Sequence, residues 1–260
     1  MKKGLKKEAF IVHTGRLNDN PVGTMNEHLL YQWEQEIAEH LPEMNSWQQA
    51  NVALFSYGVV MAGSSQQGSV ARQVNGAERV TSTVKRWQRF LGNAAFDLEG
   101  FFVTWSRWVL GALGHSRVTL LVDETKLGDR LAAMVVGVAW EKRCLPLAWQ
   151  VYGANSAADY PAEGQVKMIE GLLRLVKAGL PQGVEVLVEA DRGIGTSPEL
   201  CKAVAGLDWT YLFRVTCQTK IVTAHGDYTI ASQVQPGDIW AASGQVFKKR
   251  GHIPAHARAV

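Results

Sequence analysis

The chain lacks long apolar runs and close cysteine pairs, and each absence excludes a class of protein. Its longest uninterrupted apolar stretch, Leu131–Trp140, is about half of the ~20 residues that a membrane-spanning helix needs. Its three cysteines (Cys144, Cys201 and Cys217) are an odd number without a Cys-x-x-Cys spacing. This pattern argues against a disulfide framework and against a structural zinc site. We therefore expect no membrane span and a reduced, cytoplasmic setting.

Motifs for nucleotide binding and for serine hydrolases are also missing. Gly193-Ile-Gly195 lacks the remainder of a dinucleotide-binding or phosphate-binding loop. No Gly-x-Ser-x-Gly elbow occurs, which argues against a hydrolase of that kind. The seven histidines include no pair at metal-ligand spacing on a recognisable helix or hairpin, so zinc is not expected. The sequence therefore predicts no nucleotide cofactor.

The formal net charge of +3 is too small to identify a nucleic-acid binder, but the bases are concentrated in two segments. Gly68–Gly92 holds five bases against one acid, and the segment from Tyr211 to the end holds six against two. Both segments are candidate phosphate-facing surfaces, and the alternative is solvated charge balanced by acids elsewhere. The bases are Arg72, Arg79, Lys85, Arg86 and Arg89 in the first segment, and Arg214, Lys220, Lys248, Lys249, Arg250 and Arg258 in the second.

After a basic, polar tail over residues 1–24, residues 25–114 carry the signals of a helical bundle. Two capping-box patterns predict the starts of the first two helices, and a proline and a glycine predict their ends. A further helix carries aromatic side chains at helical spacing and is predicted to end at a glycine. The predicted boundaries are Thr24 and Pro42 for the first helix, Ser46 and Gly63 for the second, and Asp97 and Gly114 for the last.

Between these helices, Ala77–Leu91 is predicted to form an amphipathic helix. Apolar side chains recur at helical spacing on one of its faces, which is typical of a helix packed against a core. At ~100° per residue, the opposite face carries four bases. We expect one side of this helix to face the core and the other to face DNA. The candidate DNA-binding residues are Arg79, Lys85, Arg86 and Arg89.

The periodicity changes after Gly114. Three strand-like runs with short connections are expected at 118–123, 131–140 and 144–152, followed by a helix, a strand, a short helix and a strand. This order is the one expected of a ribonuclease-H-like mixed sheet over residues 115–215, in which the first and fourth strands are parallel neighbours. Residues 216–260 read as the start of a β-rich insertion. The expected fold class is therefore mixed α+β.

Two aspartates end the strands that this topology would place side by side. Asp123 follows a β-branched apolar run, and Asp191 does the same after the intervening helix. Their carboxylates would meet at one sheet edge and supply the oxygen ligands that Mg²⁺ prefers. Two such ions can clamp the attacking and leaving oxygens of a phosphodiester. A single aspartate at a strand end is more commonly a turn residue, and only the pairing favours a metal site.

Four motifs, in this order along the chain, resemble those of the DDE transposases of bacterial insertion sequences. The resemblance is to the branch whose catalytic domain carries a β-strand insertion, and it runs from about Met25 to the end. The helical segment that ends at Arg86–Asn93 resembles the N-terminal DNA-binding region of that family. The four motifs are Leu121–Lys126, Asn155–Pro161, Asp191–Gly193 and Tyr211–Val215.

The resemblance implies a cut-and-join reaction on DNA. Asp123 and Asp191 match the first two acids of a catalytic triad that binds Mg²⁺, with Mn²⁺ as a substitute and two ions in a complete site. The third acid of the family is a glutamate in a Tyr…Arg…Glu…Lys pattern, which is absent here because Glu199 is the last glutamate in the chain. We therefore expect a transposase truncated before its third catalytic acid.

The resemblance also implies partners and a location. The expected partner is the double-stranded DNA of transposon ends, and a homodimer in the DNA complex is left open. The expected location is the bacterial cytoplasm, associated with the nucleoid when DNA is bound.

Two alternatives stay open at this stage. An inactive, truncated DNA-binding protein would occupy transposon ends or inhibit the intact transposase. A ribonuclease-H-like nuclease would use a different set of acids. Glu124 and Glu189 are adjacent acids, but in a strand Glu189 shares the face of Asp191 whereas Glu124 points away from Asp123, and neither is included in the predicted site.

Overall fold

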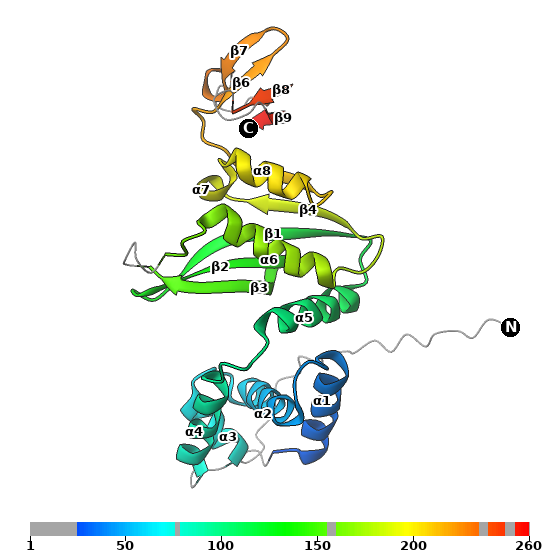
Figure 1. The fold of residues 1–260 in the computed structure, drawn as a ribbon, viewed down its shortest axis with the longest axis vertical. Coiled ribbons are helices and arrows are strands. Elements are labelled where there is room, and N and C mark those ends of the chain that lie inside the picture. The colour runs from blue at the N-terminus through cyan, green and yellow to red at the C-terminus, as the bar shows by residue number, and fades with distance from the viewer. Residues whose placement is uncertain (1–24, 76–78, 155–159, 234–238, 248–252, 260) are drawn as a thin grey trace, which may run out of the picture. The chain divides into compact units, whose positions relative to one another are not determined.

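A computed structural model describes residues 25–75, 79–154, 160–233, 239–247 and 253–259. The chain divides into two compact units, one made of Met1–Glu39 and Asn45–Ala95 and the other of His40–Met44 and Phe96–Val260 (Figure 1). Several predictions fall outside the described residues. They concern the N-terminal tail with Thr24, the first part of the Asn155–Pro161 motif, and the bases Lys248, Lys249 and Arg250.

The first unit is built from four helices: α1 (Glu27–His40), α2 (Ser46–Ala62), α3 (Gln67–Asn75) and α4 (Val80–Leu91). Helix α2 begins with a capping box, but at Asn45 and Gln48 and not at the predicted Ser46 and Gln49. The amide side chain of Asn45 accepts the hydrogen bond that the serine hydroxyl was expected to accept. The predicted end at Gly63 is confirmed, since this residue has the left-handed φ of 57° typical of a helix C-cap.

Helix α3 is a helix that the sequence does not predict. Its segment is polar and contains a glycine, so it reads as a loop, and it buries only Val70, Ala71 and Val74. It packs closely on α2 at Gly58, where an added Cβ would lie 2.6 and 2.7 Å from methyl carbons of Val70 and Val74. The close approach of the two helices therefore requires glycine at this position.

The helix expected after Asp97 is confirmed as α5 (Leu98–Leu113), with Asp97 accepting a hydrogen bond from Gly100 N and Gly114 as a left-handed C-cap. It was predicted to complete the N-terminal bundle. Its contacts are instead with α6 (Gln165–Gly179) and β3 (Arg143–Gly153) in the second unit. The boundary between the units therefore lies near Ala95 and not at Gly114, because the apolar face of α5 packs on the sheet.

The second unit contains a five-stranded mixed sheet with the order β3-β2-β1-β4-β5. The first three strands form the predicted antiparallel meander. The predicted parallel pairing of the first and fourth strands is also confirmed, and β5 is parallel to β4. The strands are β1 (Arg117–Leu127), β2 (Leu131–Trp140), β3 (Arg143–Gly153), β4 (Glu185–Ala190) and β5 (Thr210–Phe213).

Helix α6 packs on β2 and β3, and α8 (Pro198–Ala205) packs on α6 and β5 (Figure 1). The alternation along β1 explains this arrangement, since Val118, Leu120 and Val122 are buried and the residues between them are not. Their side chains join one apolar core with the buried side chains of α6, such as Ile169 and Leu173. A short helix, α7 (Arg192–Gly195), follows directly after β4.

The segment after β5 forms a second, four-stranded sheet with the order β7-β6-β8-β9. Its strands are β6 (Lys220–Thr223), β7 (Gly226–Thr229), β8 (Trp240–Val246) and β9 (Ile253–Ala259), with a 3-10 turn at Ile230–Gln233. The β character expected for this segment is therefore confirmed.

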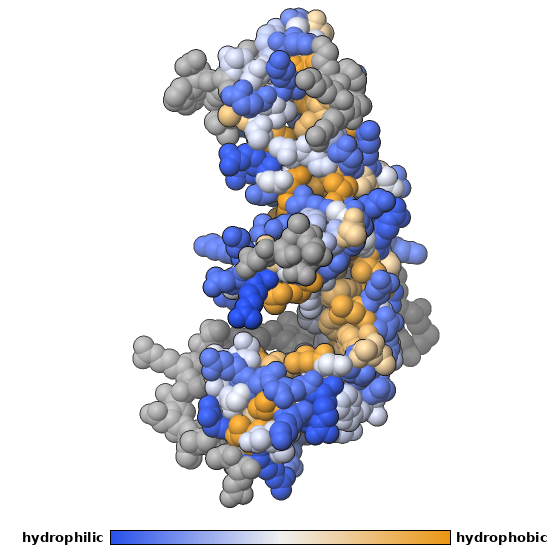
Figure 2. All heavy atoms as spheres, turned by 60° about the vertical axis from the view of Figure 1, so that its left-hand side comes forward, coloured by the Kyte–Doolittle hydropathy of each residue, from blue (hydrophilic) through white to orange (hydrophobic). Residues whose placement is uncertain are grey.

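On the face that Figure 2 shows, apolar patches lie between hydrophilic residues. Among the described residues, no helix is long and apolar enough to cross a bilayer.

Candidate functional site

The sheet register brings Asp123 and Asp191 to neighbouring positions. The last pair in the parallel ladder of β1 and β4 is Val122 with Ala190. Asp123 directly follows Val122, and Asp191 directly follows Ala190. Because adjacent strands lie ~4.8 Å apart, the two residues stand side by side where the β1–β4 ladder ends. The prediction that Asp123 ends its strand is wrong, because β1 continues to Leu127 and Asp123 pairs with Val135 of β2. Both are exposed.

Asp191 is oriented by its own backbone. Its Oδ1 atom accepts hydrogen bonds from Gly193 N at 2.9 Å and from Ile194 N at 3.1 Å, so it caps α7. Within the described residues, Oδ2 has no hydrogen-bond partner. A capping aspartate is ordinary at a helix start, but here the cap also fixes the direction of the carboxylate beside Asp123.

The charge of Asp123 acts on a nearby thiol. The pKa of Cys144 is raised, first by burial and second by the negative charge of Asp123. Cys144 lies on β3, two strands away from β1 in the sheet.

Arg214 joins Asp123 and Asp191 in a row of polar residues across β1, β4 and β5. Ala190 pairs with Phe213 in the parallel ladder of β4 and β5, and Arg214 N donates to Ala190 O at 3.1 Å. Arg214 therefore follows β5 as Asp191 follows β4. It is exposed. The sequence identifies Arg214 as one of the C-terminal bases and as part of the Tyr211–Val215 motif. It does not show which strand neighbours β4, so it cannot place Arg214 beside Asp191.

Glycine at position 195 lets α7 approach β5 closely. An added Cβ on Gly195 would lie 2.7 Å from Arg214 O and 2.8 Å from Phe213 Cβ. The helix capped by Asp191 therefore packs directly on the strand that carries Arg214. The backbone around the row of polar residues is tightly constrained.

The two adjacent glutamates lie next to this row, Glu124 on the sheet face opposite to Asp123 and Glu189 on the face of Asp191. Glu124 accepts a hydrogen bond from Gln165 Nε2 at 3.4 Å, and its charge, after burial, raises the pKa of Tyr152. Glu189 pairs with Leu121, two residues before Asp191. In the part of the chain that the structure describes, no group of three or more His, Cys, Asp or Glu residues could hold a metal ion.

The aspartate pair suits a magnesium ion because it supplies two carboxylates. Mg²⁺ is commonly bound by one or two carboxylates together with waters and phosphate oxygens of a substrate. Asp123 and the oriented Oδ2 of Asp191 provide two hard oxygen donors at one exposed edge. The remaining ligands of such an ion would come from water and from phosphate oxygens of a substrate.

In the first unit, three of the four predicted DNA-binding residues are exposed. Arg79, Lys85 and Arg89 lie on the outer side of α4 or at its N-cap. Arg86 differs, because it is half-buried and its Nε donates to Asn51 Oδ1 at 2.7 Å. Asn51 is 0% exposed. Arg86, which is expected on the basic face opposite the core, is thus tied by this hydrogen bond to a buried residue of α2.

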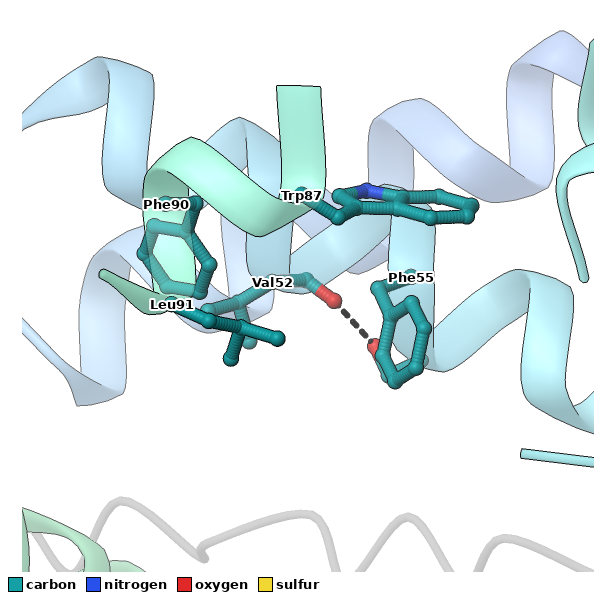
Figure 3. Close-up of a pocket in the computed structure, with 6 residues that line it drawn as sticks. Val52, Phe55, Trp87, Phe90 and Leu91 are labelled. Carbon is teal, nitrogen blue, oxygen red and sulfur yellow. Dashed lines mark hydrogen bonds between the residues drawn. The ribbon is translucent and has the colours of Figure 1, made fainter. Parts of the chain in front are cut away.

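The inner side of α4 is apolar, as predicted. Trp87, Phe90 and Leu91 of α4 and Val52 and Phe55 of α2 line a pocket of about 120 Å³ (Figure 3). The Trp87 ring is 1% exposed and meets Phe55 edge to face, with ring centroids 4.9 Å apart. The polar side of α4 consequently faces away from α2.

No protein-family model and no curated protein matches this chain. The two candidate sites of this chain are the neighbouring Asp123 and Asp191 and the outer side of α4.

Proposed function

We propose that this protein is a transposase-type enzyme, which binds transposon-end DNA and cleaves and joins its phosphodiesters with divalent metal ions. The single observation that carries the proposal is the parallel register of β1 and β4, which makes Asp123 and Asp191 neighbours at one edge of the sheet. Two neighbouring carboxylates at the end of a parallel ladder suit Mg²⁺ or Mn²⁺.

The topology supports a ribonuclease-H-like assignment of the sheet. An antiparallel meander followed by two parallel strands, with helices between the later strands, is the arrangement expected of that fold. The same proposal assigns the four-helix unit to DNA binding and the four-stranded sheet to an insertion in the catalytic domain. Four motifs in the order of the transposase family, described above, favour this assignment.

The residues of the edge have separable roles in this proposal. Asp123 and Oδ2 of Asp191 would hold the metal ions, which supply charge neutralisation for the attacking and leaving oxygens when bound. The α7 cap engages Oδ1 of Asp191, so Oδ2 is the oxygen that would bind a metal ion. Arg214 would bind a non-bridging phosphate oxygen of the DNA strand.

A specific observation favours a second candidate, a DNA-binding protein that occupies transposon ends without cleaving them. The family pattern requires a third acid, and among the described residues no group of three or more His, Cys, Asp or Glu side chains could hold a metal ion. Asp227 lies in β7 of the second sheet, away from the edge of the first. With two carboxylates, metal ions would bind weakly and cleavage would be slow.

The test begins by searching the DNA that flanks the coding region for terminal inverted repeats. Labelled duplexes with these ends are incubated with the full chain in Mg²⁺, Mn²⁺ or EDTA, and binding and nicking are measured separately. The proposal expects preferential binding of the ends and metal-dependent nicking that Asp123→Asn and Asp191→Asn both abolish.

The two candidates give different results in this experiment. Tight, specific binding without nicking in either metal would support the DNA-binding protein and overturn the enzyme. Binding no tighter than to unrelated duplexes would overturn both candidates.

A further inference from the structure

Strand β5 leaves one side of its backbone open to a further strand. Among the described residues it is hydrogen-bonded to β4 alone. Arg214 N donates to Ala190 O of β4, and the backbone groups of successive strand residues point to opposite sides. The N–H and C=O groups of Leu212 therefore face β4 as well, whereas those of Tyr211 and Phe213 face away from it. Such an outer edge is a template for pairing with another extended chain.

The opposite edge strand of the same sheet, β3, is protected. It contains Pro146, which has no N–H to offer, and Trp105 Nε1 of α5 donates to Pro146 O at 2.8 Å. Helix α5 also contacts β3. Strand β5 reads Thr-Tyr-Leu-Phe, with neither the charge nor the proline that commonly blocks an exposed edge. The β5 edge therefore lacks the protection that β3 has.

A pocket of about 440 Å³ follows this strand. Five consecutive residues at β5, 209–213, and five in β9, 254–258, line it. At ~3.3 Å per residue, the lining matches about five residues of an extended chain. The volume lies within the ~300–1,000 Å³ that ligand pockets commonly have.

The inner wall of the pocket is apolar. Cys201 of α8, Ile230 and Val246 line it, are buried, and belong to one apolar cluster. The rings of Tyr211 and Phe213 stack with centroids 4.8 Å apart and pack on the same cluster. Burial raises the pKa of the Cys201 thiol, so this thiol is neutral at pH 7 and behaves as a small apolar group. Side chains that enter the pocket should therefore be apolar.

The charge around the pocket favours an acidic partner. None of the described residues that line it is acidic, and Arg258 of β9 is an exposed base among them. From Tyr211 to the end, bases outnumber acids by six to two. Side chains of an extended chain alternate between two faces, so apolar residues can enter the pocket while the residues between them meet solvent and Arg258. A nucleic acid would match the charge but not the apolar wall.

We propose that β5 binds an extended peptide segment of a partner protein by strand addition, with apolar side chains in the pocket and acidic side chains at the alternate positions. Pairing with the backbone of Tyr211 and Phe213 supplies affinity, and the pocket and Arg258 supply sequence preference. The inference goes beyond the proposed catalytic function and does not depend on it.

The experiment selects peptides that bind the full chain from a display library of randomised octapeptides. We expect enriched peptides in which apolar residues alternate with Asp or Glu over at least four positions. The best peptide is then synthesised with N-methyl groups on its odd-numbered or on its even-numbered residues, which removes one set of N–H donors and keeps every side chain. Methylation of the set that faces β5 should weaken binding about tenfold.

Hydrogen exchange and variants locate the bound peptide. The unmodified peptide should slow amide exchange in β5. Leu212→Asp should weaken binding about fivefold by repelling the acidic side chains, and the fold should be retained because Leu212 is 61% exposed. Arg258→Ala should weaken binding about threefold and lower its salt dependence. Val151→Asp, at a 46% exposed residue of the other edge strand β3, is the matched control and should bind the peptide as the unsubstituted chain does.

The outcomes separate strand addition from other ways of filling the pocket. If methylation of neither set weakens binding, only side chains are held and strand addition is overturned. Enriched peptides without alternation, or binding that Leu212→Asp leaves unchanged, would also overturn it. If no peptide is enriched and the chain self-associates through a contact that Leu212→Asp removes, the edge pairs with a second copy and the partner peptide is wrong. Metal-dependent nicking tests the proposed function separately from all of these results.

Discussion

Arg86→Ala should destabilise the first unit although it removes a charged residue from a helix that carries DNA-binding bases. Asn51 is 0% exposed, and its Oδ1 accepts the Arg86 Nε–H at 2.7 Å. Removing the donor leaves a buried carbonyl oxygen without its partner, which costs ~1–3 kcal/mol. We expect a loss near the middle of this range, about 2 kcal/mol, because the buried methylenes of Arg86 are lost as well.

Amide hydrogen exchange followed by mass spectrometry measures this loss locally. Peptides from α2 and α4 should exchange about 30-fold faster in the variant, since 1.4 kcal/mol corresponds to a factor of ten. Peptides from β2 and β3 serve as an internal reference and should be unchanged. Arg89→Ala is the matched control, and at this exposed position the effect should stay within ~0.5 kcal/mol.

In DNA binding the order of the two effects should be reversed: Arg89→Ala should change the salt dependence of affinity, and Arg86→Ala should not. Arg89→Ala should lower the slope of log affinity against log salt by ~0.9, the value for one phosphate contact. Arg86→Ala should leave the slope nearly unchanged. If Arg86→Ala neither speeds exchange in α2 and α4 nor preserves the salt slope, Arg86 contacts DNA and its hydrogen bond to Asn51 contributes nothing.

Three further predictions concern the sheet edge and the helix packing. Asp123→Asn should lower the pKa of Cys144, because burial remains and the second cause of its raised pKa is removed. The thiolate fraction at a fixed pH below that pKa then rises, so alkylation of Cys144 should be faster, and an unchanged rate would contradict the proximity of the two groups. Gly58→Val should cost ~1–3 kcal/mol by forcing α3 away from α2, whereas Gly68→Ala in α3, with open space around it, should stabilise by up to ~1 kcal/mol in urea unfolding. Arg214→Ala should slow metal-dependent nicking, and equal nicking rates would remove Arg214 from the site.

Local signals in the sequence predict much of this fold. The β-branched run before Asp123 and the alternation of burial along β1 agree because one face of the strand packs on the core. The helix that begins at Asp97 and ends at Gly114 is predicted from its caps. These features depend on residues close to one another in the chain.

Features that depend on distant partners are not predictable in the same way. The burial of Arg86 depends on Asn51, 35 residues away, and a helical projection of α4 contains no such information. Helix α5 has an apolar face that could pack on helices or on a sheet, and only the folded chain selects the sheet. Helix α3 is missed because its few apolar residues gain stability from α2 and not from helix propensity.

The central claim is that Asp123 and Asp191 share one metal site, and Mn²⁺ binding followed by electron paramagnetic resonance tests it most directly. The full chain is titrated with a transposon-end duplex present, and Asp123→Asn, Asp191→Asn, the double variant and Asp227→Asn are compared. Asparagine at position 191 keeps a carbonyl oxygen that can cap α7. We predict that each single variant at the edge loses the bound Mn²⁺, that the double variant loses no more, and that Asp227→Asn binds normally. Unchanged Mn²⁺ binding in both single variants, or losses that add as for two separate sites, would contradict the account.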